Sequence, residues 1–547
     1  MKILGIGGSD HDLSSCLLKD DDILITIEEE RLSKEKHGSG VRSCTLNSVD
    51  YCLNEYNYNY EDMDMIITSD LFFPRLNSRK PFIDKMIKIN HHLAHNACAY
   101  YLSGYDEAAL LTIDGNGSIF AFESSETVTL GYANGKTLST IDKAYGAAGV
   151  GSIDNTSANE NSLGRFYSFF NTVCGFGFRD SGKLMGLSSY GEGNYVNEMR
   201  KFAKVEVDSK SHLNIQIDLK SSGLKDFLKY VFLKKTEEEK FKVKADIAYS
   251  AQYLLEEFIF IIMNHLYEKT KCKKLCYSGG VAYNSVINGK ILKNTPFEQV
   301  FIPPAAGDSG IAIGAALYGY YHILDNPLKK RKQLKHAYTG RTYNEDNILH
   351  AFKKFKDFIT YEKLGKEKVL EIAASCLKKG RIIGWFQGKS EIGPRALGNR
   401  SILADPRRKD MKDIINSKVK FRESFRPFAP VILREKVNEY FKTDFPDNPF
   451  MLYVSEVQED KKEIIPAVTH VDGTARLQTI DDMTNEMYYK LIQKFYELTH
   501  VPVLLNTSFN TKGKPIVESP YDAIECYLDC DMDDLFIGDY QVTKIKN

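Results

Sequence analysis

Short apolar runs separated by polar turns open the chain. An apolar run within Met1 to Gly8, an alternating run Ser14 to Leu18 and a third run Ile23 to Ile27 are divided by turns rich in Gly and Asp. Runs of this length, bounded by turn-forming residues, are typical of strands rather than helices. We therefore expect a three-stranded antiparallel sheet at the N-terminus.

Strand-like and helix-like segments then alternate along the chain. The further strand signals are Met65 to Ile67, Ala108 to Ile113, Lys274 to Tyr277 and Gln299 to Ile302. The helix-like segments cover residues 91 to 103, 243 to 269 and 309 to 323. This mixture indicates an α/β protein. No internal repeat or low-complexity segment stands out.

The pattern breaks between Asp325 and Tyr343, where a basic run from Lys329 to Lys332 follows a helix. Such a break is typical of a linker, so we predict one domain over residues 1–335 and a second over 345–547. The basic run is either a solvated linker face or a contact for an acidic partner. The second domain is expected to contain a helix and three strands: Gly365 to Lys378, Ile382 to Phe386, Val501 to Leu505 and a final strand near Leu535.

Composition narrows the class of protein. A chain of 547 residues exceeds the usual size of one core, in keeping with two domains. Lys and Arg number 72 against 73 Asp and Glu, which leaves only local patches for nucleic acid. No apolar stretch at the N-terminus has the length of a signal peptide or membrane span, so we expect a cytoplasmic protein without a membrane partner. The ten cysteines form no CxxC pair and read as reduced core thiols.

Two histidines and two aspartates are candidate metal ligands. His91 and His95 lie four residues apart on an alanine-rich helix, where both project from one face. Packed or surface histidines are the alternative for such a pair. Asp114 ends an apolar run before Gly-Asn-Gly, and Asp308 lies within Gly307-Asp-Ser-Gly310 before an apolar helix. Two His and two Asp suit a borderline divalent ion such as iron, with open positions for substrate.

Glycine turns after strands suggest nucleotide contacts. Gly5 to Ser9, the turn with Gly279 and Gly280, and the turn that begins at Gly307 all follow apolar runs. Without a Cβ, backbone N–H groups approach phosphate oxygens closely. Together these turns are typical of an ATP cleft of the actin/Hsp70/sugar-kinase type.

Two further side chains are candidates for catalysis. His11 lies in the first turn, where an imidazole can take a proton from an acceptor hydroxyl. Lys36 can neutralise a phosphate, although alone it is simply a lysine in a charged helix.

The second domain concentrates cations among glycines and prolines. Gly388 to Pro406 presents Arg395 and Arg400, and the cluster Lys420, Arg422 and Arg426 follows. Unpaired guanidinium groups are costly to bury, so this pattern predicts an anion site, with phosphate as the ligand.

In its motifs the chain resembles the O-carbamoyltransferases, a family that includes nodulation protein U, cephamycin carbamoyltransferase and tobramycin carbamoyltransferase. The matching stretches run in order over nearly the whole chain: Gly5 to Asp12, Glu28 to Arg31, His91 to His95, Asp114 to Gly117, Gly182 to Leu187, Ser278 to Gly280, Gly307 to Gly310, Gly393 to Ser401, Lys420 to Glu423, Arg426 to Pro430 and Leu505 to Asn510.

The resemblance implies two α/β domains. The first is like the threonylcarbamoyl-transferring tRNA-modification enzymes, and the second is YrdC-like and makes carbamoyl adenylate from carbamoyl phosphate and ATP. By motif position, Lys420, Arg476 and Ser508 hold these substrates, while His91, His95, Asp114 and Asp308 hold Fe²⁺ or another divalent metal. Lys36 contacts the adenylate, and His11 is the base. Asp180 and Lys183 serve acceptor or nucleotide binding. Mg²⁺, bound together with the nucleotide, is a further candidate cofactor.

The acceptor stays open. Small-molecule and glycosidic hydroxyls fit the chemistry, and so does a hydroxymethylated nucleotide or DNA base. A kinase-like ATPase with a regulatory second domain is the rival, but such a module needs no second polyanion pocket. Residues Thr129 to Asn161 show little patterned hydrophobicity and are a candidate border of the acceptor pocket. If the chain forms an oligomer, we expect a homodimer, because dimers are the commonest oligomers.

Overall fold

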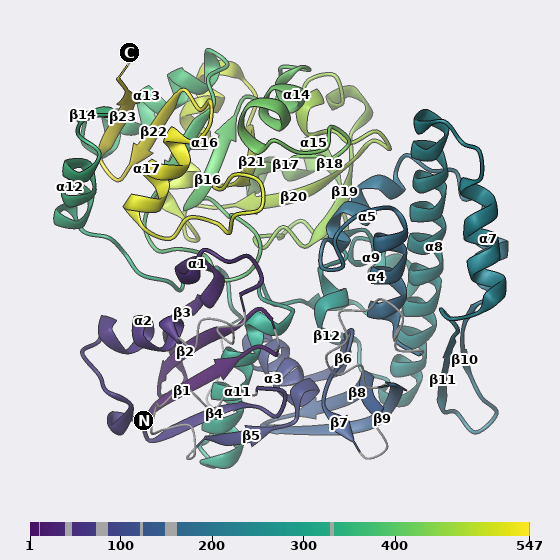
Figure 1. Cartoon of the computed structure of the whole chain (residues 1–547). Coiled ribbons are helices and arrows are strands. Elements are labelled where there is room, and N and C mark those ends of the chain that lie inside the picture. The colour runs from purple at the N-terminus through teal and green to yellow at the C-terminus, as the bar shows by residue number, and fades with distance from the viewer. Residues whose placement is uncertain are drawn as a thin grey trace.

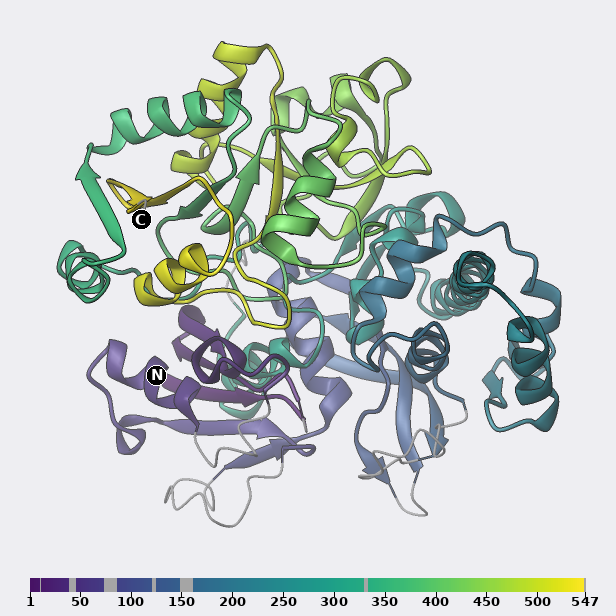
Figure 2. The same cartoon turned by 45° about the horizontal axis from the view of Figure 1, so that its top comes forward.

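The computed structural model describes residues 1–9, 11–38, 46–72, 86–120, 124–147, 161–328 and 333–545. Two large sheets and a small two-stranded one, with their helices, form an N-terminal part, and one ten-stranded sheet forms a C-terminal part that lies along it (Figures 1 and 2). Strands and helices are mixed in both parts, which confirms the α/β class.

The first sheet has the strand order β3-β2-β1-β4-β5. Its antiparallel strands β1 (Lys2–Gly7), β2 (Ser14–Lys19) and β3 (Asp22–Glu28) confirm the predicted three-stranded start. The strands β4 (Met65–Ser69) and β5 (Ile87–Ile89) add in parallel on the other side of β1.

The second sheet repeats this topology. Around β6 (Glu107–Ile113), the antiparallel strands β8 (Ser124–Asn134) and β9 (Thr137–Ala147) lie on one side, and the parallel strands β12 (Lys274–Ser278) and β13 (Gln299–Phe301) lie on the other. The short β7 (Ile119–Phe120) pairs with the start of β8. Two such sheets in sequence are the plan of the actin/Hsp70/sugar-kinase class, as the sequence predicted.

The long hairpin of β8 and β9 covers part of the stretch from Thr129 to Asn161, whose sequence shows little patterned hydrophobicity. Residues 129–147, in which we found little pattern, are regular antiparallel strands. The remaining residues up to 160 lie outside the described part of the chain.

Two helices pack together between the sheets of the N-terminal part. α3 (His91–Ser103) follows β5, and α11 (Ile311–Tyr318) follows β13. A Cβ on Gly314 would clash with the carbonyl oxygen of Ala94, so a glycine allows the two helix backbones to approach closely. This packing brings the starts of the two helices together.

The segment between β9 and β12 adds a helical layer beside the second sheet, visible on the right of Figure 1. Its longest helix starts at a capping box of Thr236 and Glu239, six residues before the predicted start. The layer contains α4 (Leu163–Val173), α5 (Ser181–Ser188), α6 (Val196–Arg200), β10 (Ala203–Val207), β11 (Leu213–Ile217), α7 (Ser222–Phe232) and α8 (Glu237–Thr270).

The C-terminal part is built on a ten-stranded mixed sheet, with the order β14-β23-β22-β15-β16-β21-β17-β20-β19-β18. The strand near Leu535, β22 (Asp534–Ile537), is followed by one more strand, so our expectation of a final strand there was wrong. The others are β14 (Ile359–Lys363), β15 (Ile383–Phe386), β16 (Arg400–Ala404), β17 (Ala429–Leu433), β18 (Phe441–Lys442), β19 (Tyr453–Val457), β20 (Thr474–Ile480), β21 (Val503–Ser508) and β23 (Tyr540–Lys544).

Helices cover this sheet and connect its strands. They are α12 (Glu345–Lys354), α13 (Lys366–Lys378), α14 (Met411–Ile415), α15 (Val437–Tyr440), α16 (Glu486–Thr499) and α17 (Pro520–Leu528). The helix predicted from Gly365 corresponds to α13.

Each part has its own large hydrophobic core, but the cores are in contact. Phe450, Met451 and Leu452 of the C-terminal part belong to the N-terminal core. The Asn288 side chain donates a hydrogen bond to the Leu452 carbonyl at 3.0 Å. The basic run Lys329–Lys332 lies outside the described residues, and the division at residues 335–345 stays a prediction.

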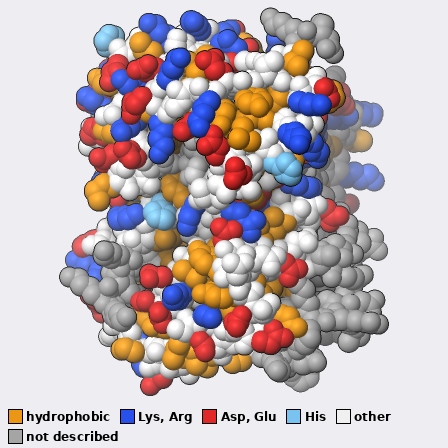
Figure 3. Space-filling view, turned by 90° about the vertical axis from the view of Figure 1, so that its left-hand side faces the viewer, with side chains coloured by type: hydrophobic (Ala, Val, Ile, Leu, Met, Phe, Trp, Pro, Cys, Tyr) orange, Lys and Arg blue, Asp and Glu red, His pale blue; other side chains and the backbone are white. Residues whose placement is uncertain are grey.

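On the face shown in Figure 3, acidic and basic side chains are interspersed. None of the helices in the described ranges combines the length and the apolar character that a membrane crossing requires.

Candidate metal and anion sites

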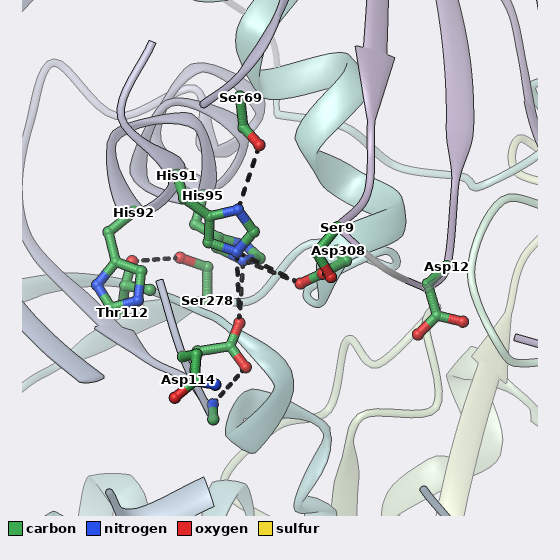
Figure 4. A network of polar contacts seen from close by, with 12 residues as sticks. Ser9, Asp12, Ser69, His91, His92, His95, Thr112, Asp114, Ser278 and Asp308 are labelled. Atoms are coloured by element: carbon green, nitrogen blue, oxygen red, sulfur yellow. Dashed lines mark hydrogen bonds and ion pairs between the residues drawn. The ribbon is translucent and has the colours of Figure 1, made fainter. Parts of the chain in front are cut away.

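The structure brings the four predicted metal ligands together (Figure 4). His91 and His95 occupy the first turns of α3, which begins there because the Asn90 side chain accepts a hydrogen bond from the Leu93 N–H at 2.9 Å. Asp114 follows β6, and Asp308 precedes α11. We call His91, His95, Asp114 and Asp308 the ligand group.

Distances within the ligand group are those of side chains facing one centre. His95 Nε2 lies 3.1 Å from Asp114 Oδ2 and 3.6 Å from Asp308 Oδ1. His91 Nε2 lies 3.9 Å and 3.5 Å from the same two oxygens. Within the described residues, both Nε2 atoms and Asp114 Oδ2 are buried without a hydrogen-bond partner. Together with Asp308, these residues offer four ligand atoms that lie within 4.8 Å of one another, which fits a divalent cation.

Neighbouring groups hold the opposite edges of these side chains. Ser9 Oγ donates to Asp308 Oδ2 at 2.6 Å, and the Gly115 N–H donates to Asp114 Oδ1 at 2.6 Å. His91 Nδ1 lies 3.4 Å from Ser69 Oγ. Each carboxylate therefore has one oxygen fixed by the protein and one turned to the centre. Ser69 was not among our candidates, because a serine at a strand end carries no signal of its own.

Charge at the ligand group is strongly coupled. Burial would lower the pKa of His91, but the charge of Asp308 and the close approach of both carboxylates raise it to about 10. In turn, the neighbouring histidines hold the pKa of each carboxyl below its usual range despite burial.

His11 lies beside the ligand group. Its Nδ1 is 2.9 Å from Asp12 Oδ2 and 3.9 Å from Asp308 Oδ2. Burial lowers its pKa, but Asp308 and Asp12 outweigh this effect and raise the pKa to about 9. Lys36, 43% exposed, lies 4.0 Å from Asp180 Oδ1.

The glycine turns border the same region. Gly279 has a φ of +90° and touches the Ile113 carbonyl so closely that a Cβ would clash with it. A Cβ on Gly280 would lie 3.1 Å from Asp114 Oδ1, and one on Gly307 would lie 2.9 Å from the Tyr283 ring. These glycines allow the turns to close around Asp114 and Asp308.

The C-terminal part contains a second site, made of cations. Arg395, Lys420, Arg422, Arg426 and Arg476, here called the cation group, are crowded enough to affect one another's charge. Burial lowers the pKa of every member, to about 10 for Arg395 and about 9 for Arg422, and Arg426 adds to both shifts.

Among the described residues, Arg426 is the only member of the cation group in an ion pair with a carboxylate. Lys420, at the end of the π-helix η7 (Asn416–Lys420), donates to neutral oxygens, including the Ser508 carbonyl at 2.7 Å and Ser508 Oγ at 3.3 Å. Among the described residues, the buried Nε atoms of Arg395 and Arg476 have no hydrogen-bond partner. Glu423 approaches Arg426 at 3.8 Å. A site with this excess of buried positive charge fits a polyanion.

Arg400 does not join the cation group, which corrects our expectation of two presented arginines. Its guanidinium is fully buried, donates to the carbonyls of Gln387, Gly388, Asn399 and Glu518, and stacks over the Phe386 ring at 3.7 Å. Its donors are satisfied by backbone oxygens, so Arg400 stabilises the loop that carries Arg395.

Charged side chains connect the two sites. Lys183 Nζ, in α5, lies 3.0 Å from Asp180 Oδ2 and 3.3 Å from Glu423 Oε1. Asp180 approaches Lys36 of the N-terminal part, and Glu423 approaches Arg426 of the cation group. The candidate residues Asp180 and Lys183 therefore lie between Lys36 and the cation group.

Fold and sites together define an α/β enzyme with two centres, one of four metal-type ligands and one of buried cations. The model of the carbamoyltransferase N-terminus matches residues 2–72 and 71–317, and that of the carbamoyltransferase C-terminus matches residues 374–544. The chain belongs to the carbamoyltransferase family and is a transferase.

Named relatives agree with this assignment. Nodulation protein NolNO of Sinorhizobium fredii is 33% identical over 98% of this chain and 79% of its own. The 3'-hydroxymethylcephem-O-carbamoyltransferase of Streptomyces clavuligerus is 30% identical over 67% of this chain and 65% of its own.

Solved structures align over 59% of the chain, with TM-scores below 0.5. The activator of 2-hydroxyisocaproyl-CoA dehydratase from Clostridium difficile has a TM-score of 0.35 at 14% identity, covering 59% of this chain and 96% of that one. HypF from T. kodakarensis has a TM-score of 0.37 at 15% identity, covering 59% and 48%. The strand orders, rather than these scores, identify the fold class.

Proposed function

We propose that the protein is an ATP-dependent O-carbamoyltransferase with two half-reactions. At the cation group, water releases phosphate from carbamoyl phosphate, and the carbamate attacks the α-phosphate of ATP to give carbamoyl adenylate and pyrophosphate. The carbamoyl group then passes to an acceptor hydroxyl beside the ligand group. The observation that carries this proposal is the pair of unlike sites joined by Asp180, Lys183 and Glu423. Substrates rich in phosphate favour the cytoplasm as the compartment.

The cation group suits the first half-reaction. Lys420, held by Ser508, and Arg476, crowded by Arg395, supply positive charge where the phosphates of both substrates gather. Arg422 and Arg426 extend this charge toward the N-terminal part. Fixed cations in a water-poor site stabilise the charge that develops during phosphoryl chemistry.

The N-terminal centre suits the second half-reaction. The acceptor oxygen attacks the carbamoyl carbon, the bond to the adenylate oxygen breaks, and AMP leaves. His11 takes the hydroxyl proton, while Lys36 lies close enough to Asp180 to meet the adenylate phosphate. The ligand group would hold Fe²⁺ or another divalent metal, which supplies Lewis-acid polarisation. The glycine turns bring backbone close to the reactants and help exclude water.

A pair of substitutions separates the two half-reactions. Lys420→Ala should abolish carbamoyl-adenylate formation, because the variant loses the buried ammonium at the anion site. His11→Asn should retain adenylate formation and lose transfer. Mass spectrometry of carbamoyl adenylate and of product measures both steps. If the two variants lose adenylate formation equally, the assignment of two separate sites is wrong.

Metal content tests the ligand group directly. We expect elemental analysis to find a divalent metal in the wild-type protein and little in the His91→Ala/Asp308→Ala double variant. Circular dichroism confirms that the variant is folded. Undiminished metal in a folded double variant would contradict the assignment.

For the acceptor we propose a small-molecule or glycosidic hydroxyl, supported by the relative that is named for a hydroxymethylcephem substrate. The test is a screen for a carbamoyl mass gain, with ATP, carbamoyl phosphate and ferrous iron supplied. A gain on a hydroxymethylated nucleotide and on no small hydroxyl compound would replace this acceptor class.

A further inference from the structure

The Asp12 carboxylate lies between two imidazoles. Its Oδ2 is 2.9 Å from His11 Nδ1, and its Oδ1 is 2.8 Å from His37 Nδ1. Asp12 and His37 both have left-handed backbones, with φ of +50° and +59°. Such conformations cost free energy in residues other than glycine, and they persist where the surrounding contacts hold them.

The first contact orients His11. A carboxylate accepts but does not donate, so the proton on Nδ1 is retained when the ring loses its other proton, and the neutral ring then has its lone pair on Nε2. The same carboxylate fixes the direction of the ring, which lies 3.9 Å from Asp308 of the ligand group. Figure 4 shows Asp12 beyond Asp308, on the side away from the two metal-type histidines.

The second contact fastens the segment that carries Lys36. His37 is held by Asp12 through its ring and by Glu30 Oε2 through its backbone N–H at 2.8 Å. The next residue, Gly38, accepts a hydrogen bond from the Leu13 N–H at 3.2 Å. Lys36 directly precedes this anchored histidine.

We propose that Asp12 is a positioning residue for carbamoyl transfer: it orients His11 directly, and through His37 it places Lys36. This inference rests on the proposed function, because it assigns Asp12 to the transfer half-reaction. Asp12, Glu30 and His37 also form a group in which a cation could sit. Asp12 already accepts from an imidazole through each oxygen, which favours the positioning role.

Asp12→Asn tests the orientation of His11. The amide cannot accept through both atoms, so we expect single-turnover transfer from carbamoyl adenylate to fall on the order of 100-fold. Adenylate formation should change less than about twofold. In a His11→Asn background the same substitution should cost almost nothing, because residues that act through one another are not additive.

A second cycle tests the placement of Lys36. His37→Ala should lower transfer about 10-fold in the wild type and have little effect beside Lys36→Ala. His37→Asn, whose amide nitrogen takes the place of Nδ1, should restore most of the rate. This cycle also serves if Asp12→Asn does not fold. Asp346→Asn, an exposed carboxylate on α12, is the matched control.

Three results would overturn the inference. The first is that the losses of transfer rate add fully in both double-variant cycles, and the second is a wild-type transfer rate in folded Asp12→Asn protein. The third is a second bound metal ion per chain that Glu30→Gln removes, because Asp12, Glu30 and His37 would then be a metal site. Failure of the proposed function looks different, because the wild-type protein itself would then make no carbamoyl adenylate.

Discussion

Arg476 is a buried cation, and we expect its burial to lower the stability of the folded chain. Its guanidinium is buried beside Arg395 and Arg422, and its pKa is held well below the usual range by desolvation and by these charges. Replacing a poorly compensated buried charge with an apolar side chain is often neutral or stabilising. We therefore expect an anion bound at the cation group to stabilise the folded chain.

We predict that Arg476→Met raises the free energy of unfolding by about 1 kcal/mol while it removes adenylate formation. Pyrophosphate should raise the Tm of the wild type but not that of the variant. Urea denaturation and thermal scans measure both effects. Arg434→Met, at an exposed ion pair with Asp481, is the control and should change stability by less than about 0.5 kcal/mol. A loss of stability in Arg476→Met would contradict the prediction.

Gly279 gives a second prediction at the residue scale. Gly279→Ala forces a side chain into a left-handed conformation and against the Ile113 carbonyl, so we expect a loss of about 2 kcal/mol or more. Because Ile113 directly precedes Asp114, bound metal should decrease as well. Gly135→Ala separates the two costs, since Gly135 has a φ of +59° but no atom of the described chain within 4 Å of the added Cβ. Equal losses in the two variants would show that the clash is harmless.

At this scale the sequence predicts residue types better than it separates their roles. The ligand group could be predicted because each member stands beside a helix start or a strand end. Arg395 and Arg400 lie five residues apart in one glycine-rich loop, and nothing local distinguishes them. Glu518, far along the chain, supplies one of the carbonyls that occupy the Arg400 guanidinium.

Among the elements, α3 depends on a buried carboxylate from another strand. Glu126 Oε1, from β8, accepts from the His92 N–H at 3.2 Å and from Asn90 Nδ2 at 2.9 Å, while Oε2 pairs with Lys143. A carboxylate at a helix N-terminus is favourable. Glu126 thus fixes the end of α3 that carries the metal-type histidines.

Glu126→Gln should cost about 3 kcal/mol, because Lys143 loses its buried partner, and it should weaken metal retention against a chelator. Burial would raise the pKa of Glu126, but His92 and Lys143 lower it to about 2. A lowered folded pKa gives stability that is complete above the unfolded value of about 4.5 and is lost as the pH falls toward 2. The stability difference between wild type and variant should therefore shrink as the pH falls below about 4.5.

Chemical denaturation from pH 7 to 3 measures this difference. Glu107→Gln in the neighbouring strand is the control, because its exposed contact with Tyr132 should matter little. A constant difference over that range would contradict the role of the Glu126 charge.

Elements themselves were the most predictable level. The helix at 91–103 and the N-terminal hairpins follow from local periodicity and turn residues. The shared strand order of the two sheets did not, because pairing is set by hydrogen bonds between distant segments, and the connections after the third strands differ. One holds α1 (Glu29–Ser33) and α2 (Asn47–Glu55), while the other holds a whole helical layer.

At the scale of the whole molecule, Glu28 and Arg31 of the N-terminal part hold Gly393 of the C-terminal part, a contact here called the clamp. Glu28 Oε1 accepts from the Gly393 N–H at 2.5 Å, and Arg31 donates to the Gly393 carbonyl at 2.7 Å. Gly393 opens the turn that leads to Arg395. The N-terminal part therefore holds a loop of the C-terminal anion site.

Arg31→Met should cost about 3 to 5 kcal/mol, since it leaves the buried Glu28 without its cation. It should also raise the KM for carbamoyl phosphate in adenylate formation, although Arg31 is not in the cation group. Steady-state kinetics at a temperature where the variant is folded measures this effect. Lys34→Met removes a more exposed bridge to Asp522 from the same helix end and should leave KM unchanged. An unaltered KM for carbamoyl phosphate in Arg31→Met would show that the clamp does not affect adenylate formation.

The repeated strand order shows which of the two units supplies each side chain of the ligand group. His91 and His95 begin the helix after the fifth strand of one unit, and Asp308 precedes the helix after the fifth strand of the other. Likewise, His11 follows the first strand of one unit, and Asp114 follows the first strand of the other. Each unit thus contributes only part of the ligand group: His91 and His95 come from the first unit, and Asp114 and Asp308 come from the second.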